Sequence, residues 1–141
     1  MGKISFYTED ITFTLSQKRD FRAWISSIVA AEGKKVGEIS YIFCSDDYLL
    51  DVNKQYLNHD YYTDIITFDY CEGDVVSGDL FISIPRVKEY ALENSIDFKK
   101  ELQRVVIHGV LHLLGQKDKK KEDAENMRKL EEKALKLFPK K

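Results

Sequence analysis

Two of the chain's three histidines lie four residues apart in one apolar stretch. His108 and His112 stand among valine, isoleucine and leucine residues, and this spacing places both imidazoles on one face of a helix. Gly115 predicts the end of that helix, and Asp118 follows three residues later. The pattern predicts that His108, His112 and Asp118 bind one divalent metal ion and leave a coordination position open, as catalytic zinc sites do.

A second interpretation of the same residues needs no metal. A buried histidine is tolerated when its ring nitrogens find hydrogen-bond partners, so His108 and His112 could instead be core residues bonded to carbonyl groups, with Asp118 a solvated loop residue. The glycine stop and the acid that follows it favour the metal. The two cysteines, Cys44 and Cys71, form no CxxC pair, which argues against a closed structural zinc site.

The residue after His108 limits the reaction that such a metal site would catalyse. In the HExxH helix of metalloproteases, a glutamate directly after the first histidine is the general base. Here that position is Gly109, which has no side chain to accept a proton. The sequence therefore argues against peptide hydrolysis of this type and predicts a metal that activates water and polarises an anionic oxygen.

Length and composition predict one cytoplasmic domain over residues 1–141. A chain of 141 residues with 43% hydrophobic and 33% charged residues is typical of a globular protein with a single sizeable core. No apolar run approaches the roughly 20 residues of a membrane span, and the N-terminus lacks the features of a signal peptide. Cys44 and Cys71 are predicted to be reduced thiols. The net charge of -2 is not that of a bulk nucleic-acid binder, so an RNA partner would need a local basic patch.

Apolar periodicity predicts a small mixed sheet with helices packed on it, which is an α/β fold of the α+β-like kind. Residues 4–7 and 11–15 are expected to form two short strands or one interrupted strand, and further strands are expected over residues 37–44, 63–70 and 79–84. Helices are expected over residues 18–32, 45–57, 85–94, 97–114 and 122–137, with Ser16, Ser45 and Asp97 as N-caps. The helix that contains both histidines is apolar nearly all round, so we expect it at the centre of the fold. In the last helix, Met127, Leu130, Ala134 and Leu137 are expected to face inward.

Beyond the histidine pair, the chain resembles the YbeY family of metal-dependent endoribonucleases, which mature ribosomal RNA. The family signature is HGxLHLxGYDH, in which three histidines bind zinc, and the stretch from His108 to Gly115 follows it closely. Asn53 and the segment from Thr63 to Phe68 look like the family's LN…PTDVLSF block. The segment from Gly78 to Ser83 looks like the strand that follows that block. The resemblance covers most of the chain, and its blocks together are far more specific than two histidines alone.

The resemblance implies an endoribonuclease that cuts single-stranded RNA, matures the 3′ end of small-subunit rRNA and acts in ribosome assembly. It implies rRNA and the ribosomal small subunit as partners, and zinc as the cofactor of His108, His112 and Asp118. Two histidines and one carboxylate also suit iron, manganese or nickel. Two other functions stay open: a metal-dependent hydrolase of a small phosphorylated or amide substrate, and a non-catalytic ribosome assembly factor whose metal only staples the last helix.

Three positions depart from the family pattern. The third histidine is Asp118 here, and its negative charge should make the metal a weaker Lewis acid than three neutral imidazoles would. The family's arginine, a cation often proposed to hold RNA phosphate, aligns with Leu57. The proline before the Thr-Asp pair is Tyr62. These differences affect substrate contacts more than fold.

Two further residues are predicted to serve catalysis. Asp64 could orient a metal ligand from behind, and its alternative role is to cap a turn before a strand. His59 could contact phosphate or carry a proton near neutral pH, and its alternative is an ordinary surface position.

Two groups of residues are candidate RNA contacts. The lysines around Asp118 would form a phosphate-facing rim, or else a solvated run before an acidic helix: Lys117, Lys119, Lys120 and Lys121. Three tyrosines could stack on unpaired bases, or else serve packing: Tyr56, Tyr61 and Tyr62.

Overall fold

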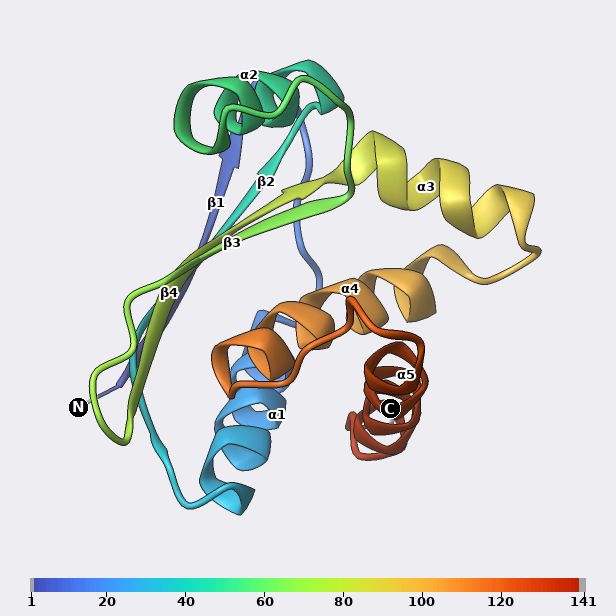
Figure 1. The fold of residues 1–141 in the computed structure, drawn as a ribbon. Coiled ribbons are helices and arrows are strands. Elements are labelled where there is room, and N and C mark those ends of the chain that lie inside the picture. Colours follow the sequence, from blue (N-terminus) through green and yellow to red (C-terminus); the bar gives the residue numbers. More distant parts are fainter. Residues whose placement is uncertain (1, 140–141) are drawn as a thin grey trace.

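A computed structural model describes residues 2–139 of the chain (Figure 1). Four strands and five helices follow one another as β1 (Lys3–Glu9), α1 (Lys18–Ala31), β2 (Lys35–Cys44), α2 (Asp46–Leu57), β3 (Ile65–Asp69), β4 (Val75–Ser83), α3 (Ile84–Glu93), α4 (Phe98–Leu113) and α5 (Lys121–Lys136). Within this range, no helix is both long and apolar enough to cross a membrane.

The four strands form one mixed sheet in the order β1-β2-β4-β3. The two pairs β1–β2 and β2–β4 are parallel, and β3 pairs with β4 in the antiparallel sense. A tight turn at Gly73, which has a positive φ of 55°, joins β3 to β4. The predicted mixed sheet with packed helices is confirmed, and β3 lies at one edge of it.

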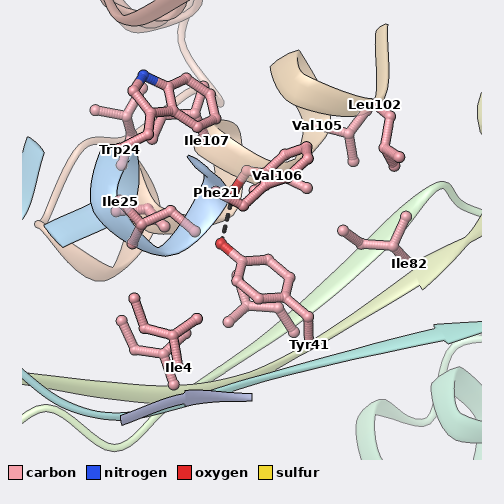
Figure 2. Close-up of a cluster of buried hydrophobic side chains, with 14 of the residues drawn as sticks. Ile4, Phe21, Trp24, Ile25, Tyr41, Ile82, Leu102, Val105, Val106 and Ile107 are labelled. Atoms are coloured by element: carbon pink, nitrogen blue, oxygen red, sulfur yellow. Dashed lines mark hydrogen bonds between the residues drawn. The ribbon is translucent and has the colours of Figure 1, made fainter. Parts of the chain in front are cut away.

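Helices cover the two faces of the sheet unequally, as Figure 1 shows. Alternate residues of the central strands, such as Tyr41 and Ile82, point into the main core against α1 and α4 (Figure 2). There the Tyr41 hydroxyl donates to the carbonyl of Val106 at 3.0 Å. The opposite face has a smaller cluster under α2, which includes Cys44 and Leu49. The alternation of side chains along each strand thus divides the apolar residues between two layers.

Close packing holds α4 against the sheet. Gly109 is buried, and a Cβ added there would lie 2.2 Å from Leu80 Cδ2 and 3.0 Å from Ile65 Cδ1. A glycine at this point therefore lets the helix approach β3 and β4 more closely than any other residue would. The same approach brings the preceding residue, His108, close to the sheet edge at β3. The prediction of a central histidine helix is confirmed.

Two predictions about strands are wrong. Residues 11–15 form no strand, because the chain leaves the sheet after β1 at Asp10, which has a positive φ of 57°. Their apolar side chains instead pack on the core from an irregular segment, as the edge-to-face contact of Phe13 with Phe43 at 5.3 Å illustrates. The strand expected from residue 79 begins earlier, at Val75, because it pairs with β2 from that point.

Two helix ends also differ from expectation. Gln17 rather than Ser16 occupies the N-cap of α1, in a left-handed conformation without a side-chain capping bond. At the other end of the chain, Leu137 is 60% exposed, and Phe138 fills the core in its place against Trp24. The helix ends at Lys136, so the spacing of the last turn no longer predicts which residue faces inward.

Candidate metal centre

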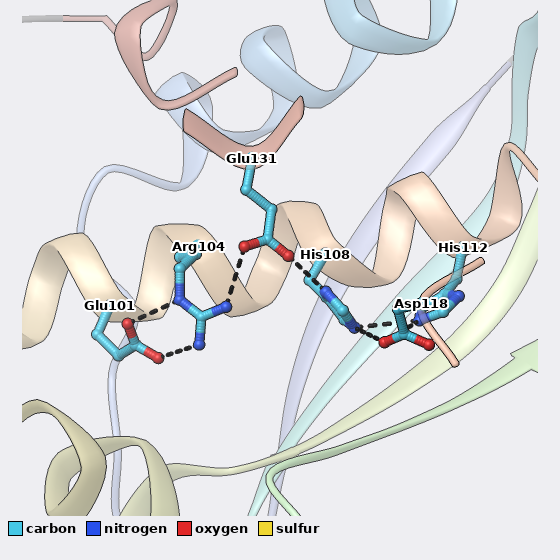
Figure 3. Close-up of polar contacts among 6 residues, drawn as sticks. All are labelled: Glu101, Arg104, His108, His112, Asp118 and Glu131. Atoms are coloured by element: carbon cyan, nitrogen blue, oxygen red, sulfur yellow. Dashed lines mark hydrogen bonds and ion pairs between the residues drawn. The ribbon is translucent and has the colours of Figure 1, made fainter. Parts of the chain in front are cut away.

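Four polar residues form a stripe along α4. Glu101, Arg104, His108 and His112 follow one another at steps of three, four and four residues, which places them on one side of the helix (Figure 3). Contrary to the prediction, the helix is therefore not apolar nearly all round, because this side has a continuous line of ionisable groups. Behind the stripe the helix is buried in the main core.

The end of α4 turns the chain back toward the stripe. Gly115 has a positive φ of 96°, its N–H donates to the His112 carbonyl at 2.9 Å, and the Gln116 N–H donates to the Leu111 carbonyl at 3.0 Å. This pair of bonds is a Schellman motif, for which glycine in the left-handed conformation is favoured. The predicted helix stop is confirmed, and the reversal returns Asp118 to the face that holds the histidines.

Three ligand atoms converge at this point. His108 Nε2 lies 3.1 Å from His112 Nε2, and Asp118 Oδ2 lies 3.3 Å from each of these nitrogens. Bonds of about 2.0–2.2 Å to a tetrahedral zinc ion would separate ligand atoms by about 3.3 Å, so the donor atoms fit such an ion. A cation shared by two unprotonated imidazole nitrogens and a carboxylate oxygen would stabilise all three atoms together. The three residues form a group that can hold a metal ion.

A buried chain of charges supports His108 from behind. Glu131 of α5 accepts a 2.5 Å hydrogen bond from His108 Nδ1, and Arg104 donates to the other oxygen of Glu131 at 3.0 Å. Arg104 also forms a two-bond ion pair with Glu101, at 2.5 and 2.9 Å (Figure 3). The proton of His108 lies on Nδ1, where it is hydrogen-bonded to the carboxylate of Glu131. The other ring nitrogen, Nε2, is therefore available to bind a metal.

The charges of this chain are mutually stabilising. Burial raises the pKa of Glu131. The hydrogen bonds from His108 and Arg104 lower this pKa by more than burial raises it, so it lies below its ordinary value and the carboxylate is ionised. Burial likewise opposes the charge of Arg104, and Glu101 and Glu131 together raise its pKa above the ordinary value. With Asp118 included, three carboxylates and one guanidinium carry a formal charge of -2. A divalent cation would balance this charge.

The ligand atoms line a hollow of about 410 Å³ between α4 and the edge strand β3. Its walls include Asp64 and Thr63 from the segment before β3, and Thr67 and Asp69 from the strand itself. The hollow thus brings Asp64 together with His108, His112 and Asp118. A larger hollow of about 620 Å³ lies over β1 and β2, and none of the residues that line it is a histidine or a cysteine.

His59 stands apart from this group. It is not among the residues that line the hollow, and its ring stacks on Tyr61 in the exposed segment between α2 and β3, with centroids 5.1 Å apart. Its catalytic role stays a prediction, as does that of Asp64. The two cysteines are free thiols, and burial is the main cause that raises the pKa of Cys44 to about 12.

Comparison with known proteins identifies the family. The family model described as Endoribonuclease YbeY matches residues 3–139. The chain belongs to the YbeY endoribonuclease family. A protein named Endoribonuclease YbeY from Phocaeicola vulgatus is 54% identical over 96% of this chain and 98% of its own length. Another of that name from Porphyromonas gingivalis strain W83 is 51% identical over 96% of this chain and 89% of its own length.

A solved structure has a similar overall fold. The solution structure of TM1509 from Thermotoga maritima superposes with a TM-score of 0.67 at 30% identity, over 96% of this chain and 91% of its own. The resemblance drawn from the histidine block and the Thr63–Phe68 block is therefore confirmed.

The sequence analysis missed the residues that support the candidate metal ligands of this YbeY chain. It gives no role to Glu101, Arg104 and Glu131, although the first two continue the histidine stripe toward the start of the helix. That spacing was the available signal for Glu101 and Arg104. Glu131 lies in a helix rich in exposed acids, and only the packing of α5 on α4 distinguishes it from its neighbours.

Proposed function

We propose that the protein is a metal-dependent endoribonuclease that cleaves phosphodiester bonds in single-stranded RNA. The observation that supports this most directly is the convergence of His108 Nε2, His112 Nε2 and Asp118 Oδ2 in an open hollow, in a chain of the YbeY endoribonuclease family. We propose zinc as the ion, because two imidazoles, one carboxylate and a free position are a common catalytic zinc arrangement. Iron, manganese and nickel are alternatives with the same donor set.

The residues of the site have distinct tasks in this proposal. His108, His112 and Asp118 would hold the ion, and Glu131 keeps the His108 proton on Nδ1. An ion bound there supplies Lewis acidity toward a phosphate oxygen and lowers the pKa of water. Asp64, on the opposite wall, would orient the reacting groups by hydrogen bonding.

The exposure of the ligands favours a polymer substrate over a small one. The side chains of His112 and Asp118 are 30% and 36% exposed, so the ligand set lies at the surface rather than at the bottom of a closed chamber. Four exposed side chains on the adjacent segment offer positive charge to a phosphate backbone: Lys117, Lys119, Lys120 and Lys121. An extended, flexible strand can reach such a site, whereas a base-paired duplex is stiffer and wider.

The proposed biological role is maturation of the 3′ end of small-subunit rRNA during ribosome assembly in the cytoplasm, by one domain that spans residues 1–141. In cells that lack the protein we expect small-subunit rRNA precursors extended at the 3′ end, and we expect His108→Ala to fail to rescue them. Normal 3′ ends in the deletion strain would contradict this role without affecting the proposed activity.

The decisive experiment measures metal content and RNA cleavage on the same purified samples. The native protein should hold one divalent ion and cut an unpaired RNA oligonucleotide. His112→Ala should lose the ion by elemental analysis, and full metal content in that variant would contradict the site. Cleavage that survives His108→Ala would reveal a contaminating nuclease. A protein that binds the ion without cutting any RNA would support the non-catalytic assembly factor instead.

A further inference from the structure

The segment between α2 and β3 leads directly into the wall of the metal hollow. We call residues 58–62 the tyrosine segment; the next two residues, Thr63 and Asp64, line the hollow. Two aromatic side chains of this segment face solvent, because Tyr61 is 55% exposed and Tyr62 is 47% exposed. This exposure is inconsistent with core packing of Tyr61 and Tyr62.

The backbone of the tyrosine segment is held in place by one buried residue. Asn53, which is 2% exposed, donates from its side-chain amide to the Tyr61 carbonyl at 2.9 Å. Its own carbonyl accepts a 3.1 Å bond from the His59 N–H. Asn58 adopts the left-handed conformation and is the residue at which α2 ends. The segment is therefore pre-formed, and a ligand that binds it pays little ordering entropy.

The ring of Tyr61 contacts another side chain on one of its two faces. Tyr61 stacks on His59 at an interplanar angle of 21°, and its hydroxyl lies 2.9 Å from His59 Nδ1. With one ring face against the imidazole and more than half of the residue exposed, the other face of Tyr61 is open to solvent. Tyr62 differs, since its ring lies under the Arg86 guanidinium at 5.1 Å and its hydroxyl donates to Asp47.

The charges around the segment favour a nucleobase over a phosphate. Lys54 pairs with Asp60 at 3.4 Å, and Arg86 forms two bonds with Asp46. Both cations are therefore already neutralised by carboxylates. An open aromatic face beside neutralised cations attracts flat π-systems, and base–aromatic stacking is tolerant of sequence because every base has such a face.

We propose that the open face of Tyr61, backed by His59, stacks on an unpaired nucleobase of RNA that lies across the metal hollow. This inference rests on the proposed function, because it takes RNA as the ligand of the neighbouring site. It assigns the two sides of the hollow different tasks: Tyr61 binds a base on the β3 side, and the lysines around Asp118 contact phosphates on the α4 side.

The test is a double-mutant cycle between the ring and the base. Binding of a short fluorescein-labelled oligouridylate to the metal-loaded protein is measured by fluorescence anisotropy, and single abasic sites are then introduced at each position of the strand. Tyr61→Ala should weaken binding by about 10- to 100-fold, and Tyr61→Phe should bind like the native protein. One abasic position should weaken binding to the native protein and have no effect on Tyr61→Ala.

A matched control is Tyr7→Ala. Tyr7 is 53% exposed on β1, at the opposite edge of the sheet from β3, so its removal should leave RNA binding and metal content unchanged. Equal affinity of Tyr61→Ala and the native protein, or additive effects of ring and base removal, would overturn the stacking contact. Cleavage is measured on the same strands. Binding with a coupled ring and base but no cleavage by the native protein would count against the proposed function and not against the stacking contact.

Discussion

The proposed metal site has two unlike sides. On the inner side, His108 is 18% exposed and is bonded to Glu131, which is in turn bonded to Arg104. On the outer side, Asp118 lies between exposed lysines on a segment without regular structure, and its carboxylate contacts the two histidines. One ligand is fixed by a buried charge chain, and the other is supplied by a surface turn.

This difference indicates which ligand of the proposed site can be exchanged for another side chain most easily. A ligand set into a close-packed interior cannot be exchanged without repacking its partners, whereas a surface turn accepts side chains of other lengths. The departure from the family pattern, aspartate in place of the third histidine, falls on the surface turn and not on α4. We therefore expect substitutions on the inner side to have larger effects than those on the outer side.

The largest effect is expected for His108→Asp. This change places a second carboxylate against the buried Glu131, and like charges that share a buried site repel each other strongly. Metal affinity should fall by more than about 100-fold, and RNA cleavage should be lost. Isothermal titration with zinc measures the affinity. Near-native affinity in this variant would show that the inner side is as exchangeable as the outer one.

A smaller but clear effect is expected for Glu131→Gln, which preserves shape and removes the charge behind His108. Loss of a group that orients a metal-bound histidine typically costs about 10- to 100-fold in metal affinity, and we expect a loss in that range. Glu132→Gln is the matched control, because Glu132 is the next residue of α5 and is exposed. Equal affinities for the two variants would mean that Glu131 only serves packing.

Asp118→His should have a modest effect despite changing a ligand. Imidazole is an equally sound zinc ligand, and the exposed turn can shift to accommodate the longer side chain. We expect metal affinity within about tenfold of the native value, with the ion still bound after dialysis, whereas Asp118→Ala should lose it. If Asp118→His released the ion as readily as Asp118→Ala, the turn would be as rigid as the inner side.

The smallest effects are expected for the lysines of the outer turn. Lys119→Ala and Lys120→Ala each remove one exposed positive charge, so each should weaken RNA binding only a few-fold. On a single strand, the slope of log affinity against log salt should fall by about 0.7 for each phosphate that is no longer neutralised by a lysine. Anisotropy titrations over a range of salt concentrations measure this slope. An unchanged slope in both variants would indicate a solvated run that does not touch the phosphates.

The features that could be predicted from the sequence are those set by residues close together in the chain. The three candidate ligands lie within one short stretch, and local signals were enough to predict that they converge: helical spacing for His108 and His112, and a glycine stop before Asp118. The parallel and antiparallel pairings of the sheet could not be predicted, because they join strands far apart in the chain. The same holds for Glu131, whose role depends on how α5 packs against α4.

Apolar character alone also misled at two places. Residues 11–15 have the composition of a strand, but a chain that has left the sheet can bury apolar side chains from an irregular path. Leu137 has the spacing of an inward residue, but the helix ends before it and Phe138 takes its place. For residues 11–15, burial was predicted correctly but the backbone geometry was not. For the end of α5, a buried apolar side chain was predicted correctly but was assigned to the wrong residue.

The direction in which α4 runs gives the site a preference for the sign of its ligand. The aligned peptide dipoles of a helix concentrate partial negative charge at its C-terminal end, worth about 0.3–1 kcal/mol to a nearby cation. His112 stands in the last turn of α4, so an ion bound there lies in this field. The same pair of histidines placed at the start of a helix would meet a positive end, which attracts anions. The orientation of α4 thus favours a cation over an anion at the proposed metal site.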